Sequence, residues 1–241
     1  ATILDAIGKI PLPPYMSREV EEGDKDRYQT LFSKELGAVA APTASLHFSE
    51  KIMEDLDRRG VHKTFLTLHV GAGTFMPVKE EHVENHPMHR EQMIFSSDQI
   101  QNLLNHQGPF IPVGTTALRA LESLYWAGVN LIECRENPFK IEQFVYEGRA
   151  KYTVEASIDA VLQFLNQNKL DSVYGQTSIM VVPGYEFKVV KGLITNFHQP
   201  KSTLLLLISA LLGDNWKKVY AHALDNGYRF LSYGDSSLLL P

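Results

Sequence analysis

The sequence predicts one α/β domain over residues 1–241, built on a largely parallel sheet or an open, barrel-like α/β arrangement. Two observations lead to this fold class. Short apolar stretches rich in β-branched residues alternate with segments whose apolar residues recur at helical spacing. Polar, glycine-rich signatures follow several of the apolar stretches, and ligands in such folds bind at the carboxyl ends of the strands. We therefore expect one pocket at that edge of the sheet.

The first third of the chain already alternates between extended and helical segments. Prolines fix an extended segment over 8–15. Apolar residues at helical spacing predict a helix over 24–35, and a short buried strand over 38–41 follows it. A second helix is predicted to begin after Ser49, a favourable N-cap residue, and to end at Gly60.

The middle of the chain continues this alternation. β-branched and aromatic residues predict a strand over 64–70, and helical spacing predicts a helix over 97–105. An apolar strand is expected over 110–113, directly before a glycine and two threonines. An amphipathic helix then covers 116–127, with Gly128 as its end signal.

The C-terminal half contains further helices and strands of the same kinds. Apolar residues at helical spacing predict helices over 154–166, 203–212 and 215–225. Apolar runs that end in polar signatures predict strands over 179–182, 192–195 and 229–232.

Composition narrows the possible function classes. A net charge of −5 and a pI near 6.0 argue against a general nucleic-acid-binding protein, which usually has a basic face. Cys134 is the only cysteine, so no internal disulfide can form, and no secretory signal pattern is visible. The longest aliphatic stretch, 204–212, is much shorter than the roughly 20 residues that span a bilayer. We expect a cytoplasmic protein with no membrane partner.

Small residues after two predicted strands form the first candidate sites. Gly114, Thr115 and Thr116 would place unpaired N–H groups and hydroxyls at a helix N-terminus, which suits a carboxylate or phosphate. Ordinary capping by either threonine is the alternative. Gly71 and Gly73 would allow a ligand to approach the backbone closely. They lack the third glycine of a dinucleotide fingerprint, so we expect no nicotinamide cofactor.

Histidines are concentrated between residues 82 and 91. His82, His86, His89 and Glu91 could ligate a metal, which leaves a metal-dependent hydrolase open, but their spacing matches no known zinc site and we expect no metal. His89 and Glu91 stand two residues apart, so on a strand their side chains would point to one side and could form a hydrogen bond.

The segment 196–203 leaves a predicted strand and enters an apolar helix. Asn196, His198, Lys201 and Ser202 supply an amide, an imidazole, an ammonium and a hydroxyl within this short stretch, although Ser202 is also a favourable N-cap. No Gly-x-Ser-x-Gly elbow is present, so a serine hydrolase is not expected.

Eight segments in order resemble the S-adenosylmethionine:tRNA ribosyltransferase-isomerases of queuosine biosynthesis. They are 8–15, 38–48, 67–78, 88–91, 114–123, 183–187, 192–206 and 228–235. The resemblance implies a transferase and isomerase that moves the ribosyl part of S-adenosylmethionine onto 7-aminomethyl-7-deazaguanine at the tRNA wobble position. Epoxyqueuosine-tRNA would form, and adenine and methionine would leave. It further implies S-adenosylmethionine as co-substrate, no tightly bound cofactor, tRNA as partner and a monomer.

The chain also departs from the family pattern. Family members carry an Asn-Asp-Thr segment and an inserted β-barrel domain before the motif at 11–15. We expect both to be absent from this chain, either because it is a fragment or because it is a reduced homologue. Gln199 and Ala117 differ from the residues usual in the family. A non-catalytic, RNA-associated homologue that keeps the fold therefore stays open beside the enzyme.

The resemblance and the strand-end positions together give the expected site residues. Acid/base chemistry is expected of His47, His69 and His198, with Asp235 orienting a histidine or receiving the incoming ammonium. The expected substrate-binding residues are Thr43, Gly71, Gly73, Thr74, His89, Glu91, Gly114, Thr115, Thr116, Arg119, Tyr185, Asn196, Lys201, Ser202 and Tyr233.

Overall fold

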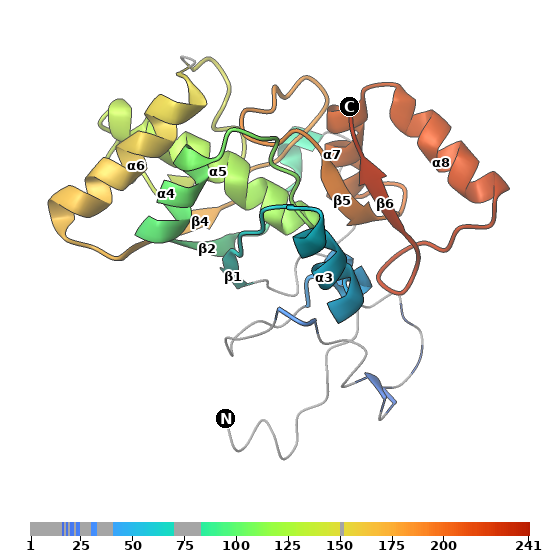
Figure 1. The fold of residues 1–241 in the computed structure, drawn as a ribbon. Coiled ribbons are helices and arrows are strands. Elements are labelled where there is room, and N and C mark those ends of the chain that lie inside the picture. The colour runs from blue at the N-terminus through green and yellow to red at the C-terminus, as the bar shows by residue number, and fades with distance from the viewer. Residues whose placement is uncertain are drawn as a thin grey trace.

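The computed structural model describes residues 16, 18, 20, 21, 23, 24, 30–32, 41–69, 83–149 and 152–241. These residues form a mixed α/β fold with a larger and a smaller sheet (Figure 1). The predicted helix over 24–35 and the predicted strand over 38–41 lie mainly outside the described residues. No helix in the described part of the chain is both long enough and apolar enough to cross a membrane.

The larger sheet has the strand order β1-β2-β4-β3. Its strands are β1 (Thr67–His69), β2 (Glu91–Ser96), β3 (Lys140–Ile141) and β4 (Ser172–Thr177). β2 pairs antiparallel with β1 and with β4, whereas the short β3 pairs parallel with β4. Burial alternates along β2, so that Glu91, Met93 and Phe95 are buried.

Three helices lie over one side of this sheet (Figure 1). They are α4 (Ser97–Asn105), α5 (Thr115–Ile132) and α6 (Val154–Asn168). Side-chain capping explains where two of these helices begin. Ser96 forms a capping box with Gln99 before α4, and Thr153 caps α6. The 3-10 helix η1 (Thr43–His47) and the helix α3 (Glu50–Arg58), whose N-cap is Ser49 as predicted, precede β1. The 3-10 helix η3 (Val83–Asn85) lies between β1 and β2 in the chain.

The central helix α5 is longer than predicted. Gly128 does not end it, and the helix continues to Ile132. A Cβ at Gly128 would lie 1.8 Å from the carbonyl oxygen of Ser157, so only glycine fits where α5 passes α6. The Ser157 hydroxyl also donates to the carbonyl of Tyr125 at this crossing. The glycine therefore serves helix packing rather than helix termination.

The smaller sheet pairs β5 (Leu193–Asn196) antiparallel with β6 (Ser236–Leu239). The helices α7 (Thr203–Leu212) and α8 (Asn215–Asp225) lie beside it and have the predicted bounds (Figure 1). The predicted strand over 110–113 is reduced to two parallel bridges, from Phe110 to Val190 and from Val113 to Ile194. These bridges place the start of α5 next to β5.

The prediction of an α/β fold is confirmed, but the described strands do not form a largely parallel sheet. Antiparallel pairs join β1 to β2, β2 to β4 and β5 to β6. The sequence pattern does not predict β4, whose polar, glycine-containing run Ser172–Thr177 lacks a continuous apolar character. This strand inserts between β2 and β3 and makes the pairing with β2 antiparallel. Closure into an open barrel stays a prediction.

Two further predicted strands are wrong for identifiable reasons. The backbone N–H groups of the buried run 179–182 do not pair with a neighbouring strand among the described residues. The Ile179 N–H donates to the Thr177 hydroxyl, and the Met180 N–H donates to the Gln143 carbonyl. The run 229–232 belongs to a closed turn in which the Asp235 N–H donates to the Arg229 carbonyl. The strand follows this turn, as β6.

Candidate functional site

The end of β5 gathers three of the expected site residues. Oδ1 of Asn196 lies 2.8 Å from Nε2 of His47, and Nδ2 of Asn196 donates to the Thr43 hydroxyl at 3.1 Å. Thr43 and His47 are the first and last residues of η1, so a single short helix presents both side chains to the amide. Asn196 itself is buried. We call Thr43, His47 and Asn196 the Asn196 group.

The N-terminus of α5 lies against this group. Gly114 is the N-cap residue with φ of 91°, a conformation that favours glycine, and no side chain caps the helix. The Gly114 N–H donates to the Ile194 carbonyl of β5 at 2.8 Å, and a Cβ there would lie 3.7 Å from Ala44 of η1. The first-turn N–H groups of α5, beginning with Thr115 and Thr116, form an arrangement that can bind an anion.

A second polar group surrounds the start of β2. Oε1 of Glu91 lies 2.9 Å from Nε2 of His89, as the strand spacing predicts, and Oε2 accepts a hydrogen bond of 2.8 Å from Nη1 of Arg119. Nε of Arg119 donates to the Ile179 carbonyl at 3.0 Å. Burial lowers the pKa of Arg119, and the charge of Glu91 opposes this effect. We call His89, Glu91 and Arg119 the Glu91 group.

Helix α5 connects the two groups. Arg119 follows Thr115 by four residues, so both side chains lie on one face of the helix, about one turn apart. Both are buried. Two polar groups that are far apart in sequence therefore meet along the first two turns of one helix.

His198 is placed differently from His47. It is buried, its Nε2 lies 3.0 Å from the Thr195 hydroxyl, and its backbone N–H donates to the Tyr220 hydroxyl. Burial lowers the pKa of His198 to about 4. The imidazole is therefore neutral at neutral pH.

Asp235 closes the turn before β6. Its carboxylate accepts hydrogen bonds from the backbone N–H of Arg229 at 2.7 Å and from the Arg229 guanidinium at 3.2 Å. These bonds hold the pKa of Asp235 below its usual value, with a smaller contribution from His47. The carboxylate is thus close enough to the Asn196 group to interact with it electrostatically.

The remaining expected residues near α7 and β6 lie around these groups. Ser202 caps α7 by accepting a hydrogen bond from the Leu205 N–H, so capping accounts for this hydroxyl. Lys201 is exposed and has a φ of 57°. The Tyr233 hydroxyl donates to Asp24 at 3.4 Å, which connects the C-terminal turn to a residue near the start of the chain.

Tyr185 lies in the core, apart from the Asn196 group, and its partner is a residue that the sequence analysis missed. The Tyr185 hydroxyl donates to Glu122 at 2.6 Å and accepts from the Trp126 indole at 3.0 Å. Glu122 is fully buried and also accepts three backbone N–H bonds, from Lys188, Val189 and Val190. A carboxylate in the middle of a strongly apolar helix is the sequence signal that could have indicated it.

Four expected site residues cannot be placed. Gly71, Gly73 and Thr74 lie outside the described residues, as does the side chain of His69, whose backbone ends β1. The histidine cluster is also only partly described, since His82 lies outside. No group of three or more histidine, cysteine or acidic side chains suited to a metal ion occurs among the residues that can be described.

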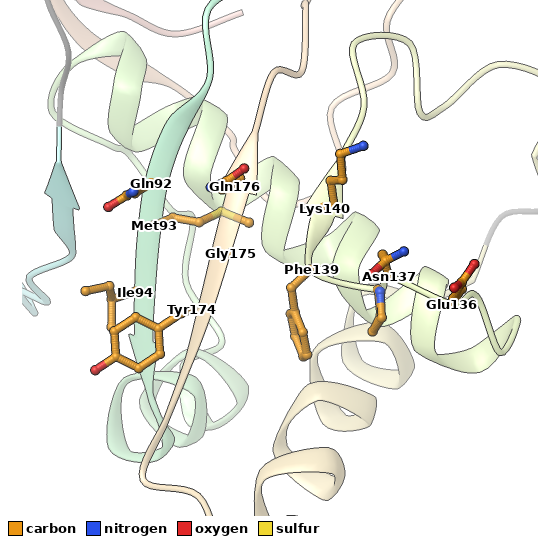
Figure 2. Close-up of a pocket in the computed structure, with 11 residues that line it drawn as sticks. Gln92, Met93, Ile94, Glu136, Asn137, Phe139, Lys140, Tyr174, Gly175 and Gln176 are labelled. Atoms are coloured by element: carbon orange, nitrogen blue, oxygen red, sulfur yellow. The ribbon is translucent and has the colours of Figure 1, made fainter.

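A cavity of about 420 Å³ lies beside β2 and β4 of the larger sheet and the segment 136–140. Figure 2 shows side chains of β2 and β4 beside the segment that carries Phe139 and Lys140. The lining includes Gln92, Ile94, Tyr174 and Gln176, which are on the outward side of the two strands. None of the expected site residues lines this cavity, so the polar groups and not the cavity define the candidate site.

Comparison with known proteins identifies the family. A family model described as "Queuosine biosynthesis protein" matches residues 1–239. The chain belongs to the queuosine biosynthesis protein family. The residues of the Asn196 and Glu91 groups all fall inside this match.

Relatives in the queuosine biosynthesis family carry the name S-adenosylmethionine:tRNA ribosyltransferase-isomerase. The proteins of that name from Erythrobacter litoralis and Rhizorhabdus wittichii are each 42% identical to this chain over 245 residues, which is 99% of the chain and 59% and 60% of the relatives. A relative from Ruegeria pomeroyi is 43% identical over 240 residues. The chain thus spans about 60% of the length of these relatives.

A solved structure of the same kind supports the fold of this family member. The crystal structure of S-adenosylmethionine tRNA ribosyltransferase from Thermotoga maritima aligns with a TM-score of 0.52 and 26% identity. The alignment covers 82% of this chain and 51% of that chain. The mixed α/β arrangement of sheets and helices is therefore shared with the solved relative.

Proposed function

We propose that this chain forms the catalytic part of an S-adenosylmethionine:tRNA ribosyltransferase-isomerase. The reaction transfers and isomerises the ribosyl group of S-adenosylmethionine onto 7-aminomethyl-7-deazaguanine at the tRNA wobble position. Epoxyqueuosine-tRNA is formed, and adenine and methionine are released. The observation that carries the proposal is identity of 42% to enzymes of that name across 99% of the chain.

The chemistry of this reaction requires an acid, a base and an anion site. The sulfonium makes its neighbouring C–H protons acidic, adenine needs a proton to leave, and the methionine part carries a carboxylate. We assign the anion site to Gly114, Thr115 and Thr116, where the uncapped N-terminus of α5 favours negative charge. Gly71, Gly73 and Thr74 are proposed to let the ribose or adenine approach the backbone.

We assign the acid to His47. Its Nε2 is fixed by the buried amide of Asn196, so the ring has a defined orientation. Asp235, which is held by Arg229 in the turn before β6, is proposed to assist this group. Burial and the low pKa of His198 favour a supporting role, in which its neutral ring holds Thr195 at the end of β5.

The further substrate contacts are proposals of the same kind. Lys201 is an exposed cation next to the N-terminus of α7 and is suited to tRNA phosphate. Tyr233 is suited to stacking on a base. Tyr185 is buried and bonded to Glu122 of α5, so we assign it to holding that helix rather than to substrate contact. We propose a cytoplasmic monomer that uses no tightly bound cofactor.

The length that the relatives have beyond this chain matters for the test. The resemblance puts the Asn-Asp-Thr segment and the inserted β-barrel domain in that extra length. The experiment therefore uses the longest native form of the protein, with tRNA that carries 7-aminomethyl-7-deazaguanine. Release of adenine from S-adenosylmethionine is measured in a single turnover.

We expect tRNA-dependent adenine release by the wild type and a loss of roughly 100-fold in His47→Ala. The matched control is His222→Ala, since His222 is exposed on α8 and contacts Asn226. Absence of release by the wild type would favour the non-catalytic, RNA-associated homologue. Equal rates for wild type and His47→Ala would remove His47 as the acid.

A further inference from the structure

The Glu91 group combines a partly exposed imidazole with a fully buried ion pair. The side chains of Glu91 and Arg119 are 1% and 3% exposed, whereas that of His89 is 20% exposed. Each oxygen of the Glu91 carboxylate has a different partner, His89 at 2.9 Å and Arg119 at 2.8 Å. A buried carboxylate that contacts a histidine ring fixes the orientation of that ring.

The backbone around this group is held from several directions. Glu91 is in register with Thr177 of β4, and Nε of Arg119 is bonded to the Ile179 carbonyl just beyond that strand. The Gln143 side chain accepts from the Met88 N–H at 3.3 Å and donates to the His86 carbonyl at 2.9 Å. The segment that carries His89 is therefore fixed on both sides of the ring.

The ion pair is poorly explained by stability alone. Nη2 of Arg119 is buried and has no hydrogen-bond partner. A buried guanidinium with an unsatisfied nitrogen is unfavourable, and a buried ion pair of this kind often stabilises a fold less than apolar residues would. An arrangement that costs stability and fixes a reachable imidazole is typical of a functional site.

We propose that His89 is the general base of the reaction, with Glu91 and Arg119 as positioning residues; this proposal rests on the proposed function. The ring takes a proton from the ribosyl 5′ carbon, which is bonded to the sulfonium. The C–H bond breaks, its electron pair stays on the carbon, and a new N–H bond forms on His89. Glu91 orients the ring and lies beside the charge that the ring gains, and Arg119 holds Glu91 in place by a hydrogen bond. The charged groups that face His89 include Glu91 from β2 and Arg119 from α5.

The test uses the full-length protein with competent tRNA and S-adenosylmethionine that is deuterated at the ribosyl 5′ carbon, which is bonded to the sulfonium. Adenine release is measured in single turnovers across pH, and binding of S-adenosylmethionine is measured separately. We expect His89→Ala to lose roughly 100-fold in rate with little change in binding, and added imidazole to restore part of the rate. The matched control is His222→Ala on α8.

The pH profile of adenine release tests the positioning role of Glu91 and Arg119. Glu91→Gln removes the negative charge beside the ring, so the acidic limb of the pH profile should move to lower pH. Arg119→Lys keeps a cation next to Glu91, so the acidic limb of the pH profile should move less in this variant than in Glu91→Gln. If Glu91→Gln does not fold, Glu91→Asp, which keeps the charge but withdraws it from the ring, should show a partial shift.

Three results would overturn the proposal. Unchanged release by His89→Ala in an active protein would remove His89 as the base and leave the proposed function standing. No adenine release by the wild type would contradict both the role of His89 and the proposed function. A lower rate in His89→Ala that imidazole does not restore, together with an unshifted profile in Glu91→Gln, would also count against the proposal, because a structural role alone predicts that combination.

Discussion

Nε2 of His47 lies 2.8 Å from Oδ1 of Asn196, although 149 residues separate them in the sequence. Oδ1 can only accept, so the imidazole donates its Nε2 proton to the amide. The amide is in turn oriented by its bond to the Thr43 hydroxyl. The neutral ring therefore carries its proton on Nε2, and Nδ1 is the nitrogen that can accept one.

Asn196→Ala tests this relationship. The substitution removes both hydrogen bonds of the amide, so we expect a loss of about 1–3 kcal/mol in the free energy of unfolding. In the full-length protein we expect kcat to fall by about tenfold or more with a smaller change in KM, because the orientation of His47 is lost. The control is Asn226→Ala at the exposed end of α8. Unchanged kcat in Asn196→Ala would contradict the assigned role.

The low pKa of His198 predicts how stability depends on pH. Above the unfolded pKa of 6.5, neither state holds this proton, so His198 contributes no pH dependence. Between 6.5 and about 4, the unfolded state binds a proton that the folded state does not, so stability falls as pH falls. Over that window the loss amounts to about 3 kcal/mol.

Urea unfolding between pH 4 and 7 measures this dependence. In His198→Gln the decline should be shallower by about 1.4 kcal/mol per pH unit at its steepest, because the titrating group is gone. An identical decline in wild type and variant would show that other groups cause it.

Glu122→Gln tests the carboxylate inside α5. The side chain of Glu122 receives four donors, namely Tyr185 and three backbone N–H groups. Glutamine would turn its own N–H₂ toward some of these donors, so we expect a loss of about 3 kcal/mol in the free energy of unfolding. The matched control is Glu155→Gln on the exposed first turn of α6, which should change stability by about 0.5 kcal/mol at most. A Glu122→Gln protein as stable as the wild type would contradict this account.

Gly128→Ala tests the crossing of α5 and α6. Alanine is favoured over glycine inside a helix by about 1 kcal/mol. The added Cβ would, however, meet the Ser157 carbonyl at 1.8 Å, so the helices must separate, at a cost of about 3 kcal/mol. Thermal unfolding should therefore show net destabilisation. Gly23→Ala is the control, because nothing lies within 4 Å of its added carbon; a stabilised Gly128→Ala protein would disprove the close approach.

The sequence predicts the helices well because their signals are local. Ser49, Ser96 and Thr153 cap their helices through bonds to residues three positions later. The strands are predicted less well, since pairing depends on distant residues. Ile179–Val182 has a strand-like composition, but its backbone groups bond to side chains and loops.

The same distinction applies to the site. The pair of His89 and Glu91 could be predicted from the two-residue spacing, because Glu91 begins β2 and His89 stands two residues before it. The pairing of His47 with Asn196 could not, since it depends on how η1 meets β5. Glu122 was missed because a carboxylate on a helix is usually exposed, and only the fold brings four donors to it.

Helix α5 starts at the Asn196 group, carries Arg119 one turn later and is held against α6 at Gly128. A rigid helix moves as one body, so a ligand that draws Thr115 toward itself also displaces Arg119. We expect binding at the two groups to be thermodynamically linked, so that each ligand changes the affinity of the other by the same factor. We therefore expect substitutions at the distant α5–α6 crossing to alter ligand affinity without touching a ligand.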